Sequence, residues 1–262
     1  MNLDLSGKTA LVCGSTQGIG KASALELAKL GATVFLCARD EAKLKLVLSE
    51  LDKSKGQEHD YLVADFSDTN LVREKVNDFV SKKGVINIVV NNTGGPAGGP
   101  ITDAKPEEFI NTFNNHLINN HTIVQAALAG MKSSGYGRVI NIISTSVKLP
   151  LPNLGVSNTI RAAVANWAKT LSNEVGKFGI TVNNVLPGAT NTGRLQQIAQ
   201  NKSDKTGTNV QDVFNHMASE VPMGRIGEPH EVAAAVAFLA SPAASYINGI
   251  NLPVDGGRTG NL

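Results

Sequence analysis

The sequence is poor in cysteine, in net charge and in long apolar runs, and each shortage excludes a class of protein. The two cysteines, Cys13 and Cys37, each stand inside an apolar run, so they indicate neither a disulfide framework nor a metal site. The formal net charge of +2 is small and evenly spread, which argues against a nucleic-acid-binding surface. No run of about 18 apolar residues is present that could form a transmembrane helix.

The remaining composition is that of an ordinary globular protein. Of the 262 residues, 42% are hydrophobic and 18% are charged, which is enough to bury a sizeable core. The first residues, MNLDLSGKTA, have neither the basic segment nor the apolar core of a secretory signal peptide. We therefore expect a soluble cytoplasmic protein in a reducing compartment, without nucleic-acid or membrane partners.

Short apolar runs rich in β-branched residues alternate with longer helical patterns along the whole chain. The strand candidates are 9–13, 32–38, 61–65, 86–92, 138–144, 180–188 and 249–257. Helical patterns begin near Gln17, Glu41, Thr69, Pro106, Gly155 and His230. Nearly continuous apolar strands separated by helices predict an α/β fold, with a doubly wound parallel sheet and helices on both faces.

Two segments interrupt this alternation and are predicted to be irregular, the glycine-rich 91–100 and the polar 189–208. Long insertions in a compact domain are typically functional, so we predict a substrate lid at about 189–220. No repeat, linker or charge block divides the chain, and 1–262 is predicted to form a single dinucleotide-binding domain.

The first strand is followed by a glycine-rich turn. Gly14, Gly18 and Gly20 have the spacing G-x-x-x-G-x-G and stand between a strand and a helix. Glycines at such a turn permit close backbone approach, and the N-terminus of the following helix supports a pyrophosphate. This arrangement predicts nucleotide binding; the alternative is a tight turn that merely packs the helix on the strand.

The ends of the second and third strands bear on the choice of cofactor. Ala38 stands where an acid would bind the ribose hydroxyls of NAD, and the planar guanidinium of Arg39 could pair with a 2′-phosphate. We therefore predict NADP, with NAD as the second choice; alternatively, Arg39 is a solvated surface residue. Asp65 could accept a hydrogen bond from the adenine amino group, or cap the helix that follows.

Several motifs occur in a familiar order along nearly the whole chain: CGSTQGIG, VVNNTGG, VINIIS, VNNVLPGATNT, MGRIGEPHEVAAAVAFLAS and VDGG. In these segments the protein resembles the short-chain dehydrogenase/reductase family, in its 3-oxoacyl-carrier-protein reductase-like branch. The resemblance implies a Rossmann fold with a seven-stranded sheet, a nicotinamide cofactor, and hydride transfer to or from a small carbonyl or alcohol. It also implies a homotetramer.

The resemblance further implies which residues bind the cofactor. They are Gly14, Ser15, Thr16, Gln17, Gly18, Ile19, Gly20, Arg39, Asp65, Phe66, Asn92, Thr93, Gly94, Pro187, Gly188, Thr190 and Thr192. The histidines share no metal-ligand spacing, so no metal site is predicted.

Enzymes of this family carry a catalytic tetrad of asparagine, serine, tyrosine and lysine. The resemblance places its serine at Ser144, but it places Ser157 at the tyrosine position, Arg161 at the lysine position and His116 at the asparagine position. A small shift would bring a neighbouring asparagine to that last position instead: Asn114, Asn115 or Asn119. The chain has three tyrosines, none of them between Ser144 and Arg161: Tyr61, Tyr136 and Tyr246.

These residue types change the expected chemistry. A serine hydroxyl is a far weaker acid than a phenol and arginine is effectively never deprotonated, so Ser157 and Arg161 cannot form the usual proton relay. With Ser144 they could instead donate hydrogen bonds to a developing oxyanion. His116 is the nearby side chain expected to titrate near neutrality and to deliver a proton.

Each of these positions also has an alternative interpretation. Ser144 could end a strand, and Ser157 could be the N-cap of the long helix. Arg161 could contact the nicotinamide ribose or pyrophosphate, or form an ion pair, and His116 could be a buried helix histidine. The sequence predicts an NADP-dependent oxidoreductase with a non-standard proton donor; the alternative is a catalytically impaired NADP-binding pseudoenzyme with a regulatory or scaffolding role.

Overall fold

The computed structural model describes residues 1–260, so the last two residues of the predicted domain lie outside the described part. One sheet is built from β1 (Thr9–Cys13), β2 (Thr33–Ala38), β3 (Asp60–Val63), β4 (Ile88–Asn91), β5 (Gly137–Ile142), β6 (Ile180–Pro187) and β7 (Asn251–Val254). Its seven strands are ordered β3-β2-β1-β4-β5-β6-β7, and every neighbouring pair is parallel. The predicted doubly wound, seven-stranded Rossmann sheet is confirmed.

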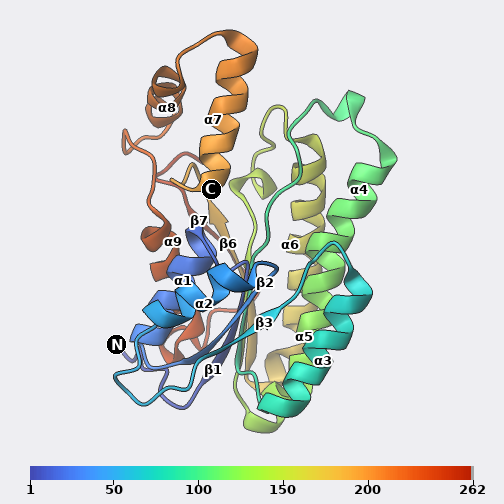
Figure 1. The fold of residues 1–262 in the computed structure, drawn as a ribbon, viewed down its shortest axis with the longest axis vertical. Coiled ribbons are helices and arrows are strands. Elements are labelled where there is room, and N and C mark those ends of the chain that lie inside the picture. Colours follow the sequence, from blue (N-terminus) through green and yellow to red (C-terminus); the bar gives the residue numbers. More distant parts are fainter. Residues whose placement is uncertain (261–262) are drawn as a thin grey trace.

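Helices cover both faces of the sheet (Figure 1). One face carries α1 (Gly18–Lys29), α2 (Glu41–Glu50) and α9 (Pro229–Ala240), and the other carries α3 (Thr69–Lys83), α5 (Asn119–Ser134) and α6 (Gly155–Val175). Alternate residues of a strand point to opposite faces, so Val12 of β1 packs under α1 whereas its neighbours Leu11 and Cys13 pack under α3 and α5. Burial on both faces explains why the strands are apolar nearly throughout.

α4 (Pro106–Phe113) continues into α5 through a π-helical turn, η2 (Asn114–Ile118), so the helical pattern that begins near Pro106 extends to Ser134. The segment 189–208, predicted to be irregular, contains α7 (Gly193–Thr206), and α8 (Val210–Ser219) follows it. The side chains of Thr192 and Asn209 cap these two helices by accepting hydrogen bonds from Leu195 N and Gln211 N. In the largely polar α7, the cap outweighs the weak apolar pattern.

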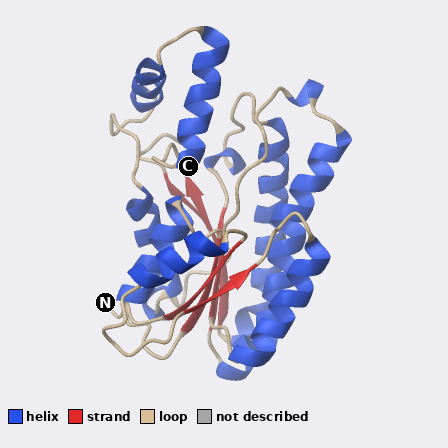
Figure 2. Cartoon of the chain, viewed as in Figure 1, coloured by secondary structure: helices blue, strands red, loops and turns tan. Residues whose placement is uncertain are grey.

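The glycine-rich segment 91–100 is irregular, as predicted, and runs beyond β4 to a short 3₁₀ turn. The 3₁₀ turns of the structure are η1 (Ile101–Asp103), η3 (Thr145–Val147), η4 (Gly176–Phe178) and η5 (Pro242–Ala244). All strands are parallel, so their carboxyl ends lie at one edge, and α7 and α8 stand beyond that edge (Figure 2). The sheet order reverses between β1 and β4, the position at which open α/β sheets bind ligands.

A row of asparagines links the four strands on one side of this switch point. Asn91 Nδ2 donates to Asn141 Oδ1 at 2.9 Å, and Asn141 Nδ2 donates to Asn184 Oδ1 at 2.9 Å. Asn184 Nδ2 in turn donates to Asn251 Oδ1 at 2.8 Å. Each pair consists of register neighbours, so the row aligns the carboxyl-terminal halves of β4, β5 and β6 with the start of β7.

Candidate active site

The glycine turn after β1 is packed directly against the end of β4. A Cβ atom on Gly20 would lie 2.2 Å from the carbonyl oxygen of Gly14, and one on Gly14 would lie 2.7 Å from the carbonyl oxygen of Asn92. Asn92 Nδ2 donates to the carbonyls of Cys13 and Gly14, both at 3.3 Å. Gly14 and Gly18 have φ angles of 58° and 55°, a region that favours glycine. The turn therefore needs glycine both for its conformation and for its space.

The same turn leaves the start of α1 free for an anion. Gln17 is the N-cap residue, and its side chain makes no capping hydrogen bond, so the first N–H groups of α1 have no side-chain partner. Thr192, 174 residues away along the chain (192 − 18), is brought to this point: a Cβ on Gly18 would lie 3.2 Å from its methyl group. Ser15 is fully buried and its hydroxyl accepts from Cys37 N at 3.0 Å, so its side chain ties the turn to β2.

Arg39 and Asp65 lie together at the ends of β2 and β3. Arg39 is exposed, and Asp65 accepts from Ser67 N at 3.0 Å and from Ser67 Oγ at 2.9 Å. These two hydrogen bonds, and further the positive charge of Arg39, lower the pKa of Asp65. The side chain that caps α3 is Asp68, which accepts from Asn70 N and Leu71 N, so the interpretation of Asp65 as the helix cap is wrong.

The other predicted cofactor residues also lie beyond the carboxyl ends of the strands, around the switch point between β1 and β4, and this region is called the crevice. Gly188 packs on Asp255, whose Cβ would be 2.7 Å from a Cβ at Gly188. Thr190 Oγ1 donates to the carbonyl of Gly188 at 3.2 Å, which shapes the loop after β6. The remaining ones lie in the glycine turn, after β3, after β4 and at the end of β6: Thr16, Ile19, Phe66, Thr93, Gly94 and Pro187.

Ser157 and Arg161 dock the start of α6 onto the end of β5. Arg161 Nη1 donates to the carbonyls of Ile142 and Ile143 at 3.2 and 2.9 Å, and its Nε donates to Ser157 Oγ at 3.3 Å. Ser157 is buried in the first turn of α6, but the N-cap residue is Leu154, so the N-cap interpretation of Ser157 is wrong. Arg161 thus lies against the backbone that leads into Ser144.

Ser144 follows β5, which ends at Ile142. Its Oγ accepts from Ser146 N at 3.1 Å and caps the 3₁₀ turn η3. Ser144, Ser157 and Arg161 are therefore brought to one place, at the carboxyl edge of the sheet. The tyrosines are engaged elsewhere: the hydroxyl of Tyr61 donates to Glu41, that of Tyr136 donates to the Ala240 carbonyl, and Tyr246 is fully exposed.

His116 does not have the titration behaviour expected of a proton donor. It is 4% exposed in the π-helical turn η2, and burial, followed by the positive charge of Arg161, lowers its pKa to about 3. A hydrogen bond with the Gly94 backbone opposes this shift in part. The imidazole is neutral at pH 7, so the expectation that His116 titrates near neutrality is wrong. Its alternative interpretation, a buried helix histidine, is confirmed.

The alternative asparagines lie in or next to this turn. Asn114 and Asn115 belong to η2 itself, and Asn119 Nδ2 donates to the carbonyl of Phe66 at 2.7 Å. The amide of Asn119 therefore joins α5 to the segment after β3. π-Helical turns occur often at functional sites, and this one positions His116 beside Arg161.

Arg194 was not among the predicted site residues, yet it belongs to the site. It stands in the first turn of α7, and its Nη2 donates to the carbonyl of Pro96 in the glycine-rich segment. Its charge contributes to lowering the pKa of Arg161 to about 10, after burial, which is the larger cause. The one sequence signal was its position, two residues after Thr192 in the motif that follows β6.

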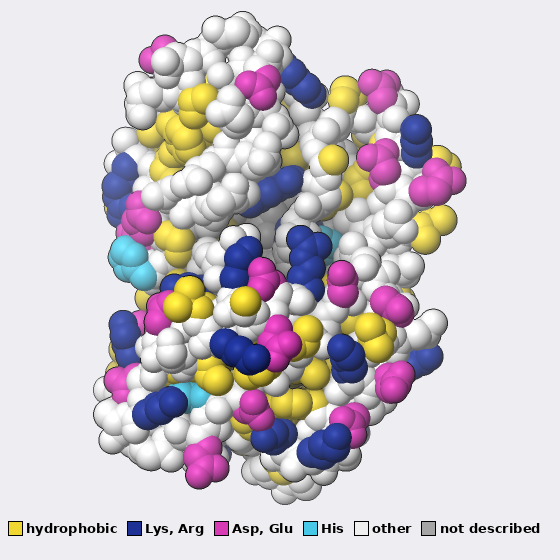
Figure 3. Space-filling model, in the orientation of Figure 1, with side chains coloured by type: hydrophobic (Ala, Val, Ile, Leu, Met, Phe, Trp, Pro, Cys, Tyr) yellow, Lys and Arg dark blue, Asp and Glu magenta, His cyan; other side chains and the backbone are white. Residues whose placement is uncertain are grey.

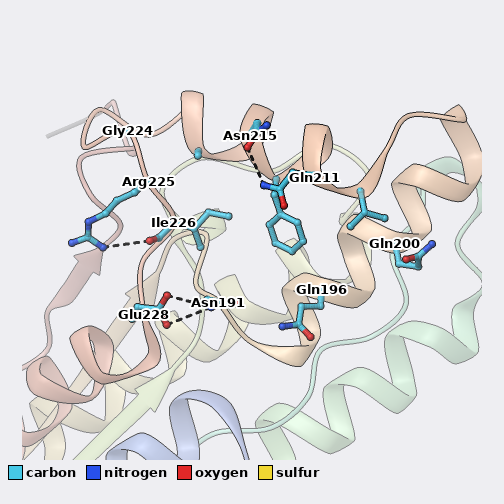
Figure 4. A pocket seen from close by; sticks show the side chains of 12 residues that line it. Asn191, Gln196, Gln200, Gln211, Asn215, Gly224, Arg225, Ile226 and Glu228 are labelled. Atoms are coloured by element: carbon cyan, nitrogen blue, oxygen red, sulfur yellow. Dashed lines mark hydrogen bonds between the residues drawn. The ribbon is translucent and has the colours of Figure 1, made fainter.

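A separate cavity lies on the other side of α7. It measures about 560 Å³ and is bounded by α7, α8 and the segment 224–228 (Figure 4). Its lining combines amide side chains, among them Gln196, Gln200 and Gln211, with apolar ones such as Phe214 and Ile226. None of the predicted site residues lines it, so the crevice at the switch point and this cavity are distinct.

A metal-ion site and a membrane-spanning helix are both absent from residues 1–260. No group of three or more His, Cys, Asp or Glu side chains there is arranged to hold a metal ion. Nor does that part of the chain contain a helix of the length and hydropathy needed to cross a bilayer.

The fold and the crevice define a dinucleotide-binding α/β protein, and comparisons with known proteins give its family. A family model described as enoyl-(acyl carrier protein) reductase matches residues 14–259. The chain is 36% identical to a chloroplastic tropinone reductase homolog of Arabidopsis thaliana, over 98% of this chain and 77% of that protein. It is 33% identical to the 3-oxoacyl-(acyl-carrier-protein) reductase FabG of Pseudomonas aeruginosa, over 97% of this chain and 98% of that protein.

The structure gives the same result. The crystal structure of L-sorbose reductase from Gluconobacter frateurii, complexed with NADPH and L-sorbose, superposes with a TM-score of 0.93. The two sequences are 30% identical, and the match covers 100% of both chains. The protein belongs to the short-chain dehydrogenase/reductase family.

The lowered pKa of His116 predicts an acid-dependent loss of stability. A histidine in the unfolded chain titrates near 6.5, so the unfolded state binds more protons than the folded state between pH 6.5 and about 3. The free energy of unfolding should therefore fall as the pH drops through this range, by up to about 1.4 kcal/mol per pH unit from this one group. Urea unfolding of wild type and His116→Gln at several pH values measures it.

His216→Gln is the matched control, because the side chain of His216 is 60% exposed on α8. In the control the free energy of unfolding should depend on pH as it does in wild type, whereas in His116→Gln it should depend on pH less steeply. Equal slopes for wild type and His116→Gln would show that His116 ionises normally in the folded protein.

Proposed function

We propose that the protein is an NADP-dependent reductase that transfers a hydride between nicotinamide and a small carbonyl or alcohol. The observation that carries this proposal is the crevice, where the close contact of Gly14, Gly20 and Asn92 positions the unpartnered N-terminus of α1. The relatives named above support it, because they are described as reductases and L-sorbose reductase was crystallised with NADPH. A 3-oxoacyl compound is the first substrate class to examine, given the similarity to FabG.

The residues of the crevice suit NADP. The free N–H groups of α1 suit the pyrophosphate, and the exposed guanidinium of Arg39 suits the 2′-phosphate. Asp65 keeps one carboxylate oxygen, Oδ2, without a hydrogen bond among the described residues, and this oxygen is available to the adenine amino group. When bound, the nicotinamide supplies the hydride.

We propose that the positions of the family's tyrosine and lysine are held here by Ser157 and Arg161, so the site works by electrostatic stabilisation. Ser144 Oγ accepts from Ser146 N, and Ser157 Oγ accepts from Arg161 Nε. Each hydroxyl therefore keeps its own proton to donate to a developing alkoxide, with the Arg161 charge behind it. Neutral His116 carries one ring N–H but lacks the acidic second proton of an imidazolium at pH 7, so the alkoxide takes its proton from water.

Cofactor preference tests the role of Arg39. Arg39→Ala should weaken NADPH binding about tenfold to a hundredfold, because it removes one charge-assisted contact with the 2′-phosphate. NADH binding should change little, since NADH lacks this phosphate. Fluorescence titration of both variants with both cofactors measures the effect. Tighter binding of NADH than of NADPH by the wild type would contradict the proposal.

Ser144 tests the oxyanion role. Ser144→Ala should lower kcat by about 10²–10³-fold, the usual effect of removing one such donor, and leave the Kd for NADPH unchanged. NADPH oxidation is followed with a panel of small ketones, aldehydes and 3-oxoacyl thioesters. Ser133→Ala is the control, because Ser133 is exposed near the end of α5 and donates only to a backbone carbonyl there. Tight NADPH binding without turnover on the panel would favour a pseudoenzyme instead.

We also propose that the protein is a homotetramer. Trp167 and Leu171 of α6 remain partly exposed, whereas Ile160 and Val164 of the same apolar stripe are buried against the chain itself. Met223 and Tyr246 are exposed as well, at 62% and 101%. Light scattering at micromolar concentration should give about four times the chain mass of 27.5 kDa. A monomer would contradict this assignment.

A further inference from the structure

Two arginines from distant parts of the chain meet over one glycine of the 91–100 segment. A Cβ atom on Gly95 would lie 3.4 Å from Arg161 Nη2 and 3.7 Å from Arg194 Nη2. Arg161 comes from α6 and Arg194 from the first turn of α7. The face of the molecule drawn in Figure 3 is hollowed in its middle, and Lys and Arg side chains gather around this hollow.

No acid of residues 1–260 compensates these two charges. Neither arginine takes part in any of the ion pairs of the described chain. The pKa of each guanidinium is lowered by burial, and Arg161 is lowered further by Arg194, with no carboxylate acting in the opposite direction. The two positive charges repel each other, and burial removes part of their hydration. Both effects cost free energy unless an anion binds between the two guanidinium groups.

The hydrogen bonds of the two side chains leave donors for such an anion. Arg161 Nη1 donates to the carbonyls of Ile142 and Ile143, and Arg161 Nε donates to Ser157 Oγ. Nη2 therefore has no hydrogen-bond partner in the described chain. Arg194 uses Nη2 on Pro96, which leaves Nη1 and Nε. Gly95 contributes no side chain, so both guanidinium groups approach its backbone closely, with Arg161 Nη2 and Arg194 Nε each within 4 Å of the position a Cβ would take.

We propose that Arg161 and Arg194 together bind a carboxylate of the substrate, and hence that the substrate is a small oxo acid. Guanidinium groups bind carboxylates through paired, charge-assisted hydrogen bonds. Because Arg161 also contacts Ser157 and the backbone beside Ser144, the carboxylate lies within a few bonds of the carbonyl that is reduced. This inference rests on the proposed reductase function and deepens it.

Binding to the NADP⁺-loaded protein tests the proposal without turnover, because the oxidised cofactor cannot reduce an oxo acid. Calorimetry compares pyruvate with methyl pyruvate and acetoacetate with methyl acetoacetate, pairs that differ in charge but share the same carbonyl. At least one acid should bind about tenfold or more tightly than its ester to the wild type. Arg194→Gln should weaken binding of that acid about tenfold to a hundredfold and leave the ester unchanged.

Two further variants control for charge and for folding. Arg194→Lys should retain part of the preference for the acid, because the charge remains while the paired geometry is lost. Arg73→Gln, on the exposed side of α3, should behave as wild type. The Kd for NADP⁺ should be the same in all variants, which also shows that they are folded.

Several outcomes would overturn the carboxylate site. These are equal binding of acid and ester by the wild type, binding of neither acid, or equal weakening of acid and ester by Arg194→Gln. Weaker NADP⁺ binding by Arg194→Gln would assign the arginines to a cofactor phosphate instead. The reductase proposal fails on a different result. Binding of an acid without NADPH oxidation on any carbonyl would reject the reductase and keep the anion site. Turnover of neutral carbonyls without preference for acids would keep the reductase and reject the anion site.

Discussion

The close contact between the glycine turn and the end of β4 is the constraint on which the rest of the site depends. Gly20 has no room for a side chain against the Gly14 carbonyl, and Asn92 closes the gap by donating to that same carbonyl and to Cys13. This contact joins the two halves of the sheet at the point where the strand order reverses. It also places the start of α1 at the crevice, where its free N–H groups are available to an anion.

Charge and burial then decide the chemistry of the crevice. Arg161 has a structural role, because it ties α6 to the carbonyls at the end of β5, and the same guanidinium places a positive charge beside Ser144 and Ser157. That charge, together with burial, keeps His116 neutral. A site with a permanent cation and no acidic proton suits the stabilisation of negative charge better than proton relay.

The relatives place this chain among hydride-transferring enzymes, and the local chemistry distinguishes it within that group. The glycine turn and the N-terminus of α1, which suit a dinucleotide, consist of glycines and backbone N–H groups. They can therefore be kept when other side chains of the site are substituted. The groups of the proposed substrate site come from α6, α7 and the 91–100 segment, which are separate from the glycine turn. In these proposals the arginine pair bears on which substrate is bound, whereas the glycine turn holds the pyrophosphate and Arg39 bears on which cofactor is bound.

The fold and the cofactor crevice could be predicted from the sequence because their determinants are local: apolar runs of strand length, and glycines spaced around a strand–helix turn. Helix α7 was missed because its sequence is largely polar, so it depends on the cap at Thr192 more than on an apolar stripe. The neutral state of His116 could not be predicted from residue type, since it depends on burial and on the approach of Arg161. Likewise, the meeting of Arg161 and Arg194 over Gly95 joins residues far apart in the chain, and such contacts arise only when the sheet brings α6, α7 and the β4 loop to one edge.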